Sequence, residues 1–246
     1  MSEDQGTEQA RDEAKPARAA RGAPKWETDA RERLRAAIRR YSKPLADLVA
    51  RDANEGDTRL LVTDFLCDGL GYDKYAELST EKMVRGEFAD YAVRLDKQTV
   101  AFIEVKRAAT KLAEKHLRQV EMYAVNDGVE WMILTNGAVW QVYHLEVAAK
   151  PATIDLVIAA DLLGADTPAA KTAALFPITR EGMKRDVIDE VWRARRATSP
   201  ASLAAVILSE PVTTVIRREL RRQTGHQIDP DELTRLLRET VLKGCD

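Results

Sequence analysis

The sequence contains few cysteines and no long apolar run. Its two cysteines, Cys67 and Cys245, are far apart, which excludes a disulfide scaffold and a cysteine-based zinc site. No apolar stretch approaches the roughly 20 residues that a membrane-spanning helix needs. The charged, Ala-rich N-terminus also has no apolar segment typical of a secretory signal. We therefore expect a cytoplasmic protein that does not associate with a membrane.

A large excess of one charge is missing as well. The 38 Lys and Arg residues nearly balance the 40 Asp and Glu residues, and the formal net charge is −2. This disfavours binding of nucleic acid through overall positive charge, although it leaves room for a local basic stripe. Hydrophobic residues make up 45% of the 246 residues, so the chain has enough apolar surface for a packed core.

The first part of the chain divides into a tail and two helices. Residues 1–24 have no large apolar side chain beyond Met1, which predicts a disordered tail. A folded region is expected from residue 25 to residue 150. Its apolar spacing predicts a helix over 26–51, kinked or split at Pro44, and a second helix over 54–70 with Asn54 as its N-cap.

The apolar pattern then changes to a period of two. It predicts strands over 75–81, 87–95 and 99–106, with a tight turn between the second and third strands. A helix over 111–126 follows, and then a strand over 130–135. Asn136-Gly137 is a strong hairpin signal that predicts a returning strand over 138–145. Together these elements predict an α/β fold with a mixed sheet flanked by helices.

Beyond residue 150 the patterns become mainly helical. The segment 153–158 is compatible with one more strand, but residues 151–246 are otherwise expected to form an α-helical C-terminal region. Asp229-Pro230 predicts a helix start, with an N-cap followed by proline at the first helical position. The expected helices cover residues 161–175, 181–196, 202–208, 212–223 and 229–242.

The residues that indicate chemistry are acids on strands. Asp90 lies in the middle of a predicted strand, where Asp is rare, and Glu104 lies near the end of the partner strand. The short hairpin brings both carboxylates together, and at about 4 Å they would repel by roughly 4 kcal/mol at an effective dielectric near 20. A divalent metal ion offsets this repulsion, and Lys106 adds a cation on the same face as Glu104. The arrangement favours metal-assisted hydrolysis of a phosphodiester.

Five short motifs occur in the order found in a known family. They are Asn54-Glu55, Ala89-Asp90-Tyr91, Glu104-Val105-Lys106, Gln119 with Tyr123, and Thr135-Asn136-Gly137. In these motifs, residues 50–146 resemble the PD-(D/E)xK nuclease superfamily, and most of all the N-terminal nuclease domain of type I restriction enzyme R subunits. The resemblance implies a restriction-endonuclease-like α/β fold. Ala89 stands where the superfamily name has proline.

The resemblance also implies a role for each motif residue. Asp90, Glu104 and the carbonyl of Val105 would bind Mg²⁺ or Mn²⁺, and Lys106 would position or activate the attacking water. Glu55 would approach from its helix, although a Glu in the first helical turn also serves the helix dipole. Gln119 and Tyr123 share a helix face and would support the site or contact DNA, unless they are ordinary helix residues.

Basic residues outside these motifs are weaker candidates for contacts to nucleic acid. They lie in two groups, Lys111, Lys115 and Arg118 near the middle of the chain and Arg217, Arg218, Arg221 and Arg222 near its end. Phosphate contacts and ordinary solvated helix faces are about equally compatible with the first group. Residues 147–246 contain no phosphate-binding G-x-x-x-x-G-K-[ST] loop, so we expect neither an ATP site nor an ATP-driven motor there.

The sequence supports three hypotheses about function. The first is a Mg²⁺-dependent deoxyribonuclease domain without its motor, in restriction or phage defence, with DNA and a second copy or other defence-system subunits as partners. The C-terminal region would then serve docking, dimerisation or DNA contact. The second is an inactive nuclease-fold module that binds nucleic acid or a protein. The third is an RNA nuclease, since the same chemistry does not distinguish the sugars.

Overall fold

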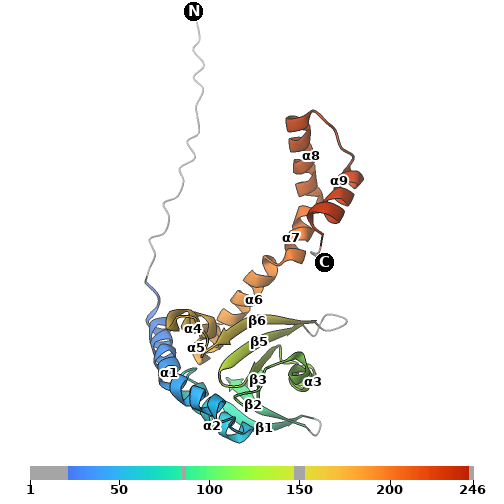
Figure 1. Ribbon diagram of the computed structural model, residues 1–246. Coiled ribbons are helices and arrows are strands. Elements are labelled where there is room, and N and C mark those ends of the chain that lie inside the picture. Colours follow the sequence, from blue (N-terminus) through green and yellow to red (C-terminus); the bar gives the residue numbers. More distant parts are fainter. Residues whose placement is uncertain (1–21, 85–86, 147–152, 244–246) are drawn as a thin grey trace, which may run out of the picture.

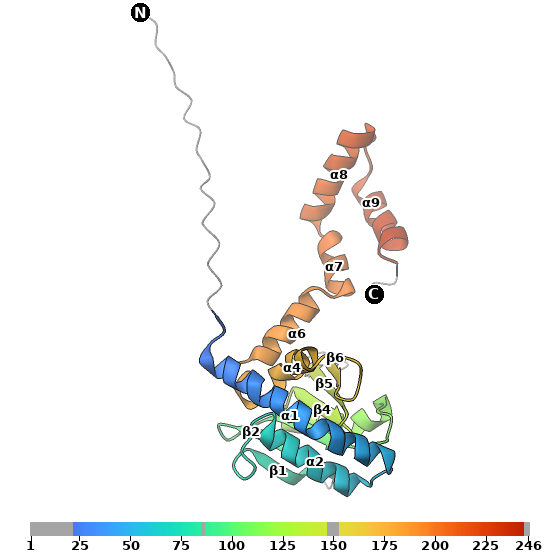
Figure 2. The same ribbon diagram turned by 60° about the vertical axis from the view of Figure 1, so that its left-hand side comes forward.

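The computed structural model of the chain describes residues 22–84, 87–146 and 153–243. Most of the predicted tail over residues 1–24 therefore lies outside the described residues. Within the described ranges, no helix is both long enough and apolar enough to cross a membrane. Figures 1 and 2 show an α/β body, residues 25–197, from which an arm, residues 199–243, extends away from the sheet.

A six-stranded mixed sheet forms the centre of the body, and its strands follow one another in chain order. Neighbouring strands are antiparallel except β3 and β4, which are parallel. A parallel pair needs a crossover, and α3 (Leu117–Asp127) supplies it. The strands are β1 (Leu78–Val84), β2 (Glu87–Leu95), β3 (Gln98–Val105), β4 (Trp131–Thr135), β5 (Val139–Glu146) and β6 (Thr153–Asp161). These observations confirm the predicted α/β class.

Two N-terminal helices cover one face of the sheet (Figures 1 and 2). They are α1 (Lys25–Ala50) and α2 (Glu55–Asp68). Helix α1 continues through Pro44, so the predicted split is wrong. Its apolar side chains on both sides of the proline, including Leu34 and Leu45, are buried in the main core, and this packing offsets the hydrogen bond that proline removes.

The opposite face of the sheet is covered by α3. A second, smaller core lies there, in which Val120 and Ala124 of the helix pack against Phe102 and Met132 of the sheet. By the alternation of a strand, Phe102 and Glu104 point to this face, whereas Ile103 and Val105 belong to the main core. Glu104 therefore lies on the face of the sheet opposite to Ile103 and Val105.

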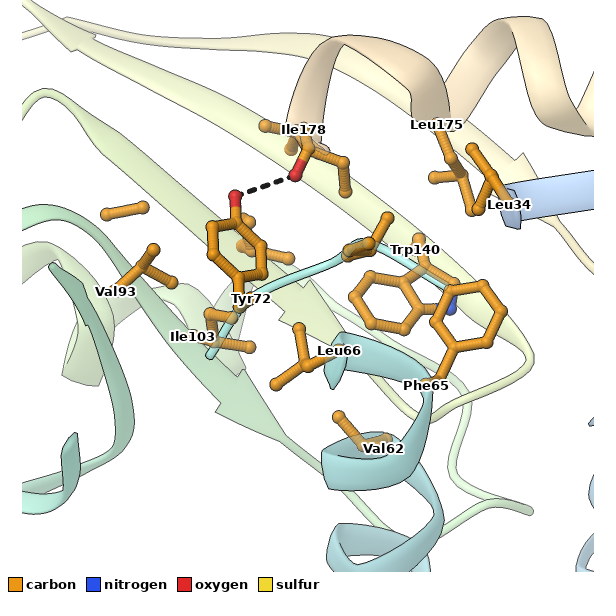
Figure 3. Close-up of a cluster of buried hydrophobic side chains, with 14 of the residues drawn as sticks. Leu34, Val62, Phe65, Leu66, Tyr72, Val93, Ile103, Trp140, Leu175 and Ile178 are labelled. Atoms are coloured by element: carbon orange, nitrogen blue, oxygen red, sulfur yellow. Dashed lines mark hydrogen bonds between the residues drawn. The ribbon is translucent and has the colours of Figure 1, made fainter. Parts of the chain in front are cut away.

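The body continues well past residue 150, so the predicted boundary there is wrong. Strand β6 pairs along its length with β5, and the next elements fill the main core. In Figure 3, Leu175 and Ile178 lie in one cluster with Phe65 and Trp140, and the Tyr72 hydroxyl donates to the Ile178 carbonyl at 2.7 Å. These elements are α4 (Pro168–Leu175), the 3-10 turn η2 (Phe176–Ile178), α5 (Arg180–Met183) and α6 (Val187–Ala197).

Two boundaries near these strands differ from the predictions for local reasons. Strand β1 starts later than predicted because the Asp73 side chain accepts hydrogen bonds from Tyr75 N and Ala76 N, which makes a turn. Residues 162–167 form a loop rather than a helix. The Lys171 ammonium donates to the carbonyls of Leu162 and Gly164 and holds that loop in place.

The arm consists of short helices that contact one another in sequence. They are α7 (Pro200–Ile207), α8 (Glu210–Thr224), α9 (Pro230–Leu236) and a π-helical turn η3 (Leu237–Val241). The Asp229 side chain accepts from the N–H groups of Asp231 and Glu232 and caps α9, as predicted. In both views, α8 and α9 lie far from the sheet (Figures 1 and 2).

Candidate active site

Asp90 of β2 and Glu104 of β3 lie at neighbouring positions on paired strands. The antiparallel register joins Tyr91 to Ile103, and Asp90 and Glu104 are the residues next to that pair. Asp90 Oδ2 accepts a hydrogen bond from the main-chain N–H of Val105 at 2.8 Å. This bond ties the carboxylate of one strand to the backbone of the other, so the position of Asp90 is set by the sheet itself.

Glu104 is almost completely buried, with its side chain only 4% exposed. Its Oε1 accepts from the Lys106 ammonium at 2.5 Å, whereas its Oε2 is buried and has no hydrogen-bond partner among the described residues. Burial, together with the negative charges of Asp90 and Glu55, raises the pKa of Glu104 to about 7 against the lowering effect of Lys106. A buried carboxylate oxygen without a partner is costly, and a bound cation would satisfy it.

Lys106 follows the last residue of β3 and is half-buried. Its main-chain N–H donates to the Thr135 carbonyl at 2.8 Å, which extends the pairing of β3 with β4. Burial opposes the charge of its ammonium, but the hydrogen bond and charge of Glu104 outweigh burial and raise the pKa of Lys106. The ammonium therefore stays charged beside Glu104.

The N-terminus of α2 is fixed next to this strand end. Asn54 accepts from the Asp57 N–H at 2.8 Å, which confirms the predicted cap. One turn on, the Thr58 hydroxyl accepts from the Ala108 N–H at 3.1 Å and joins the helix to the loop after β3. Glu55 lies in this first turn, and its charge raises the pKa values of both Glu104 and Lys106. Its proposed role stays a prediction.

Arg59 is the site residue that the sequence analysis missed. Its Nη1 lies 3.0 Å from Asp90 Oδ1, so both oxygens of Asp90 accept hydrogen bonds within the chain. The spacing of four residues between Glu55 and Arg59 places them on one helix face. That spacing was visible in the sequence, but only the packing of α2 on β2 selects Asp90 as the partner.

The Asn136-Gly137 turn supports the same edge of the sheet. The Asn136 side chain accepts from the Val139 N–H at 2.7 Å and donates to the Thr110 carbonyl at 2.9 Å, so it holds the loop that follows Lys106. Gly137 has φ of +83°, and a Cβ there would lie 2.8 Å from Leu45 of α1. The motif is therefore a tight turn that packs closely against α1. Its Asn136 also holds the loop next to the carboxylates by a hydrogen bond.

The remaining predicted residues do not enlarge this cluster. The side chains of Gln119 and Tyr123 lie outside the described residues, so their predicted roles are untested. Lys111, Lys115 and Arg118 are exposed. However, α3 begins at Leu117 after a 3-10 turn over Glu114–His116. The predicted helical stripe is therefore wrong for Lys111, because Asn136 holds the loop before α3 in a non-helical path.

The arginines of α8 lie away from the site, in the arm (Figure 1). Arg217 donates to the Ile228 carbonyl, and Arg222 forms an ion pair with Glu219 of the same helix. Arg218 and Arg221 are exposed. Their predicted contact with nucleic acid stays a prediction.

The donors at the site suit a hard divalent cation. Among the described residues, no three His, Cys, Asp or Glu side chains are grouped closely enough to hold a metal ion. Two carboxylates are, however, a typical protein contribution to Mg²⁺, which keeps several waters. Asp90 and Glu104 are two such carboxylates, and the Oε2 of Glu104 has no hydrogen-bond partner among the described residues. The predicted ligands Asp90, Glu104 and the Val105 carbonyl therefore stay a proposal that fits the geometry.

The comparisons with known proteins agree with the position of the cluster. Residues 54–156 match the family model described as type I restriction enzyme R protein N terminus (HSDR_N). The match begins at the cap of α2 and ends within β6, so it contains Glu55, Asp90 and Glu104. No curated protein and no solved structure shows significant similarity to the chain.

Proposed function

We propose that the type I restriction enzyme R protein N-terminal domain over residues 54–156 is a divalent-metal-dependent nuclease that hydrolyses DNA phosphodiester bonds. The observation that carries this proposal is the pair formed by Asp90 and Glu104, with the buried and unpartnered Oε2 of Glu104. DNA is the proposed substrate because restriction enzymes act on it.

Four residues of the chain have a role in the proposed hydrolysis: Glu55, Asp90, Glu104 and Lys106. A divalent metal ion bound there would polarise the phosphodiester and stabilise the charge that develops during the reaction. Asp90 and Glu104 would hold that ion, and the backbone bond from Val105 keeps Asp90 in place. The Lys106 ammonium, beside Glu104 Oε1, orients the attacking water and balances developing negative charge. Glu55 would approach the site from the first turn of α2.

The direct test is cleavage by the full chain. Supercoiled plasmid, linear duplex, single-stranded DNA and RNA are incubated with Mg²⁺, with Mn²⁺ or with a chelator. We expect metal-dependent cleavage of DNA that is lost in Asp90→Asn and Glu104→Gln, and that falls about 10²- to 10⁴-fold in Lys106→Ala.

The matched control is Asp96→Asn, which changes an acid in the same hairpin. Asp96 is 82% exposed and pairs with Lys184 rather than with the site, and asparagine tolerates its positive φ of 49°. This control should cleave like the unchanged chain. Full activity in Asp90→Asn and Glu104→Gln would overturn the site, and cleavage of RNA alone would overturn the substrate.

A second candidate function is an inactive module that binds nucleic acid or a protein. The observation that favours it is that each carboxylate already has a cation of the chain, Arg59 for Asp90 and Lys106 for Glu104. Thermal melting separates the two functions. A nuclease site should be stabilised by Mn²⁺, by up to about 2.7 kcal/mol at a hundredfold excess over Kd, whereas a module without a metal site should show neither this shift nor cleavage.

A further inference from the structure

Arg59 and Asp90 form an ion pair in which the carboxylate has a second bond to the backbone and the guanidinium is the more exposed partner. Asp90 is only 11% exposed, and its second oxygen is held by the backbone of β3. The Arg59 side chain is 39% exposed. Among the described residues, its guanidinium forms a side-chain hydrogen bond and ion pair with Asp90. Any rearrangement of the pair would therefore move the guanidinium and leave the carboxylate in place.

The backbone at Arg59 is also fixed, and it is fixed to the strand that carries Asp90. The Arg59 carbonyl accepts from the Tyr91 hydroxyl at 3.0 Å and from the Thr63 hydroxyl at 2.8 Å. Tyr91 is buried and follows Asp90 in β2. The Arg59 backbone therefore stays beside the carboxylates, whichever way its long side chain directs the guanidinium.

The charges of the cluster explain why such a movement would matter. With both carboxyls ionised, as metal binding requires, Asp90 and Glu104 are balanced by Arg59 and Lys106, and Glu55 leaves one negative charge nearby. A divalent cation added to these five residues makes the cluster positive by one charge. A single phosphodiester then restores neutrality. The guanidinium displaced from Asp90 is at that moment the group best suited to bind a phosphate, because its planar donors match phosphate oxygens in pairs.

We propose that Arg59 is a two-position phosphate-binding residue: it holds Asp90 in the metal-free protein, and it contacts the substrate phosphate once a metal ion has taken its place at Asp90. This inference rests on the proposed nuclease function and adds a residue and an order of events to it. With Arg59 acting in this way, the metal ion and DNA each increase the affinity for the other, since both favour the same position of the guanidinium.

The first experiment measures Mn²⁺ binding to the full chain by calorimetry, without DNA. Because the guanidinium competes with the metal ion, Arg59→Gln should bind Mn²⁺ more tightly, on the order of fivefold for a partly exposed ion pair. Arg51→Gln is the matched control, since it removes an exposed arginine near the same end of α2 that pairs with Asp57 instead. The control should bind Mn²⁺ like the unchanged chain.

The second experiment measures the affinity for a short duplex by fluorescence anisotropy, with and without Mn²⁺, in a Lys106→Ala background that slows cleavage. Mn²⁺ should increase the affinity for DNA, and Arg59→Gln should remove most of that increase. Arg59→Lys keeps the charge but not the planar donors, so it should recover only part of it. Melting curves of each variant verify that the fold is intact.

The outcomes separate this inference from the proposed function. Tighter Mn²⁺ binding together with a smaller metal-dependent gain in DNA affinity supports it. Unchanged or weaker Mn²⁺ binding in Arg59→Gln overturns it, even if the unchanged chain cleaves DNA, because Arg59 would then only brace Asp90. If the unchanged chain neither binds Mn²⁺ nor cleaves DNA, the proposed function and this inference both fall.

Discussion

The body and the arm are both rich in helices, but they bury very different amounts of apolar surface. In the body, large side chains such as Leu34, Phe65 and Trp140 are fully buried in one continuous core. In the described part of the arm, only Thr213 and Leu233 are buried. Large apolar side chains of the arm remain exposed at Leu203, Val206, Val215, Leu220 and Val241.

The difference shows that the two regions are specified in different ways. Two of the arm helices begin at strong local signals, Ser199 before Pro200 and Asp229 before Pro230, whose side chains accept hydrogen bonds from the first turn. The body depends on contacts between segments far apart in the chain, such as the bidentate pair of Arg33 with Glu181. Local signals are sufficient to shape the arm, whereas the body requires its whole core.

The largest expected effect comes from two truncations that test this division. A chain that ends at residue 150 lacks β6 and the buried Leu175 and Ile178, and it should lose cooperative unfolding. A chain that ends at residue 198 lacks only the arm and should melt within a few degrees of the full chain. Circular dichroism melting and size-exclusion chromatography measure both. A well-folded chain ending at residue 150 would contradict the extended body.

A smaller effect is expected from matched substitutions in the two regions. Phe65 is buried against Trp140 with ring centroids 5.3 Å apart, and Phe65→Ala should lower the free energy of unfolding by about 3–5 kcal/mol. Leu203 is 49% exposed in the arm, and Leu203→Ala should cost less than about 0.5 kcal/mol. Urea unfolding measures both values. A comparable loss in the arm would show that a partner or a second copy covers it in solution.

The smallest effect concerns pH and the attachment of α6 to the sheet. His144 of β5 is buried between Trp131 and Trp192, and its ring stacks on Trp192 of α6 with centroids 3.7 Å apart. Burial lowers the pKa of His144, although the acids around it, Glu130, Asp189, Asp155 and Glu146, act in the opposite direction.

The sign of the pH effect follows from that lowered pKa. As the pH falls below about 6.5, the unfolded chain takes up a proton before folded His144 does, so the folded state loses stability. His144→Phe keeps the ring between the two tryptophans but does not titrate, and it should be less sensitive between pH 7 and pH 5. Melting temperatures across this range give the comparison, and identical pH dependence in both proteins would show that His144 is not the group responsible.

Local features of the fold and of the candidate site could be predicted from the sequence. Asn54 and Asp229 cap helices through bonds to residues two or three positions away, and Asn136-Gly137 turns the chain with its own side chain and glycine backbone. Alternation over a few residues was enough to place Asp90 and Glu104 on paired strands with Lys106 beside them. Each of these features depends on short-range bonding and periodicity, which a sequence displays directly.

Only the tertiary structure decided which distant groups meet. It placed side chains of β6 and of the following elements, up to Ile188, in the main core, because their burial depends on α1 and the sheet rather than on any local pattern. It let α1 pass through Pro44 for the same reason. It also chose Arg59 as the partner of Asp90 and left Oε2 of Glu104 buried without one. A sequence names the charges, but their partners and their burial are fixed by how the helices pack on the sheet.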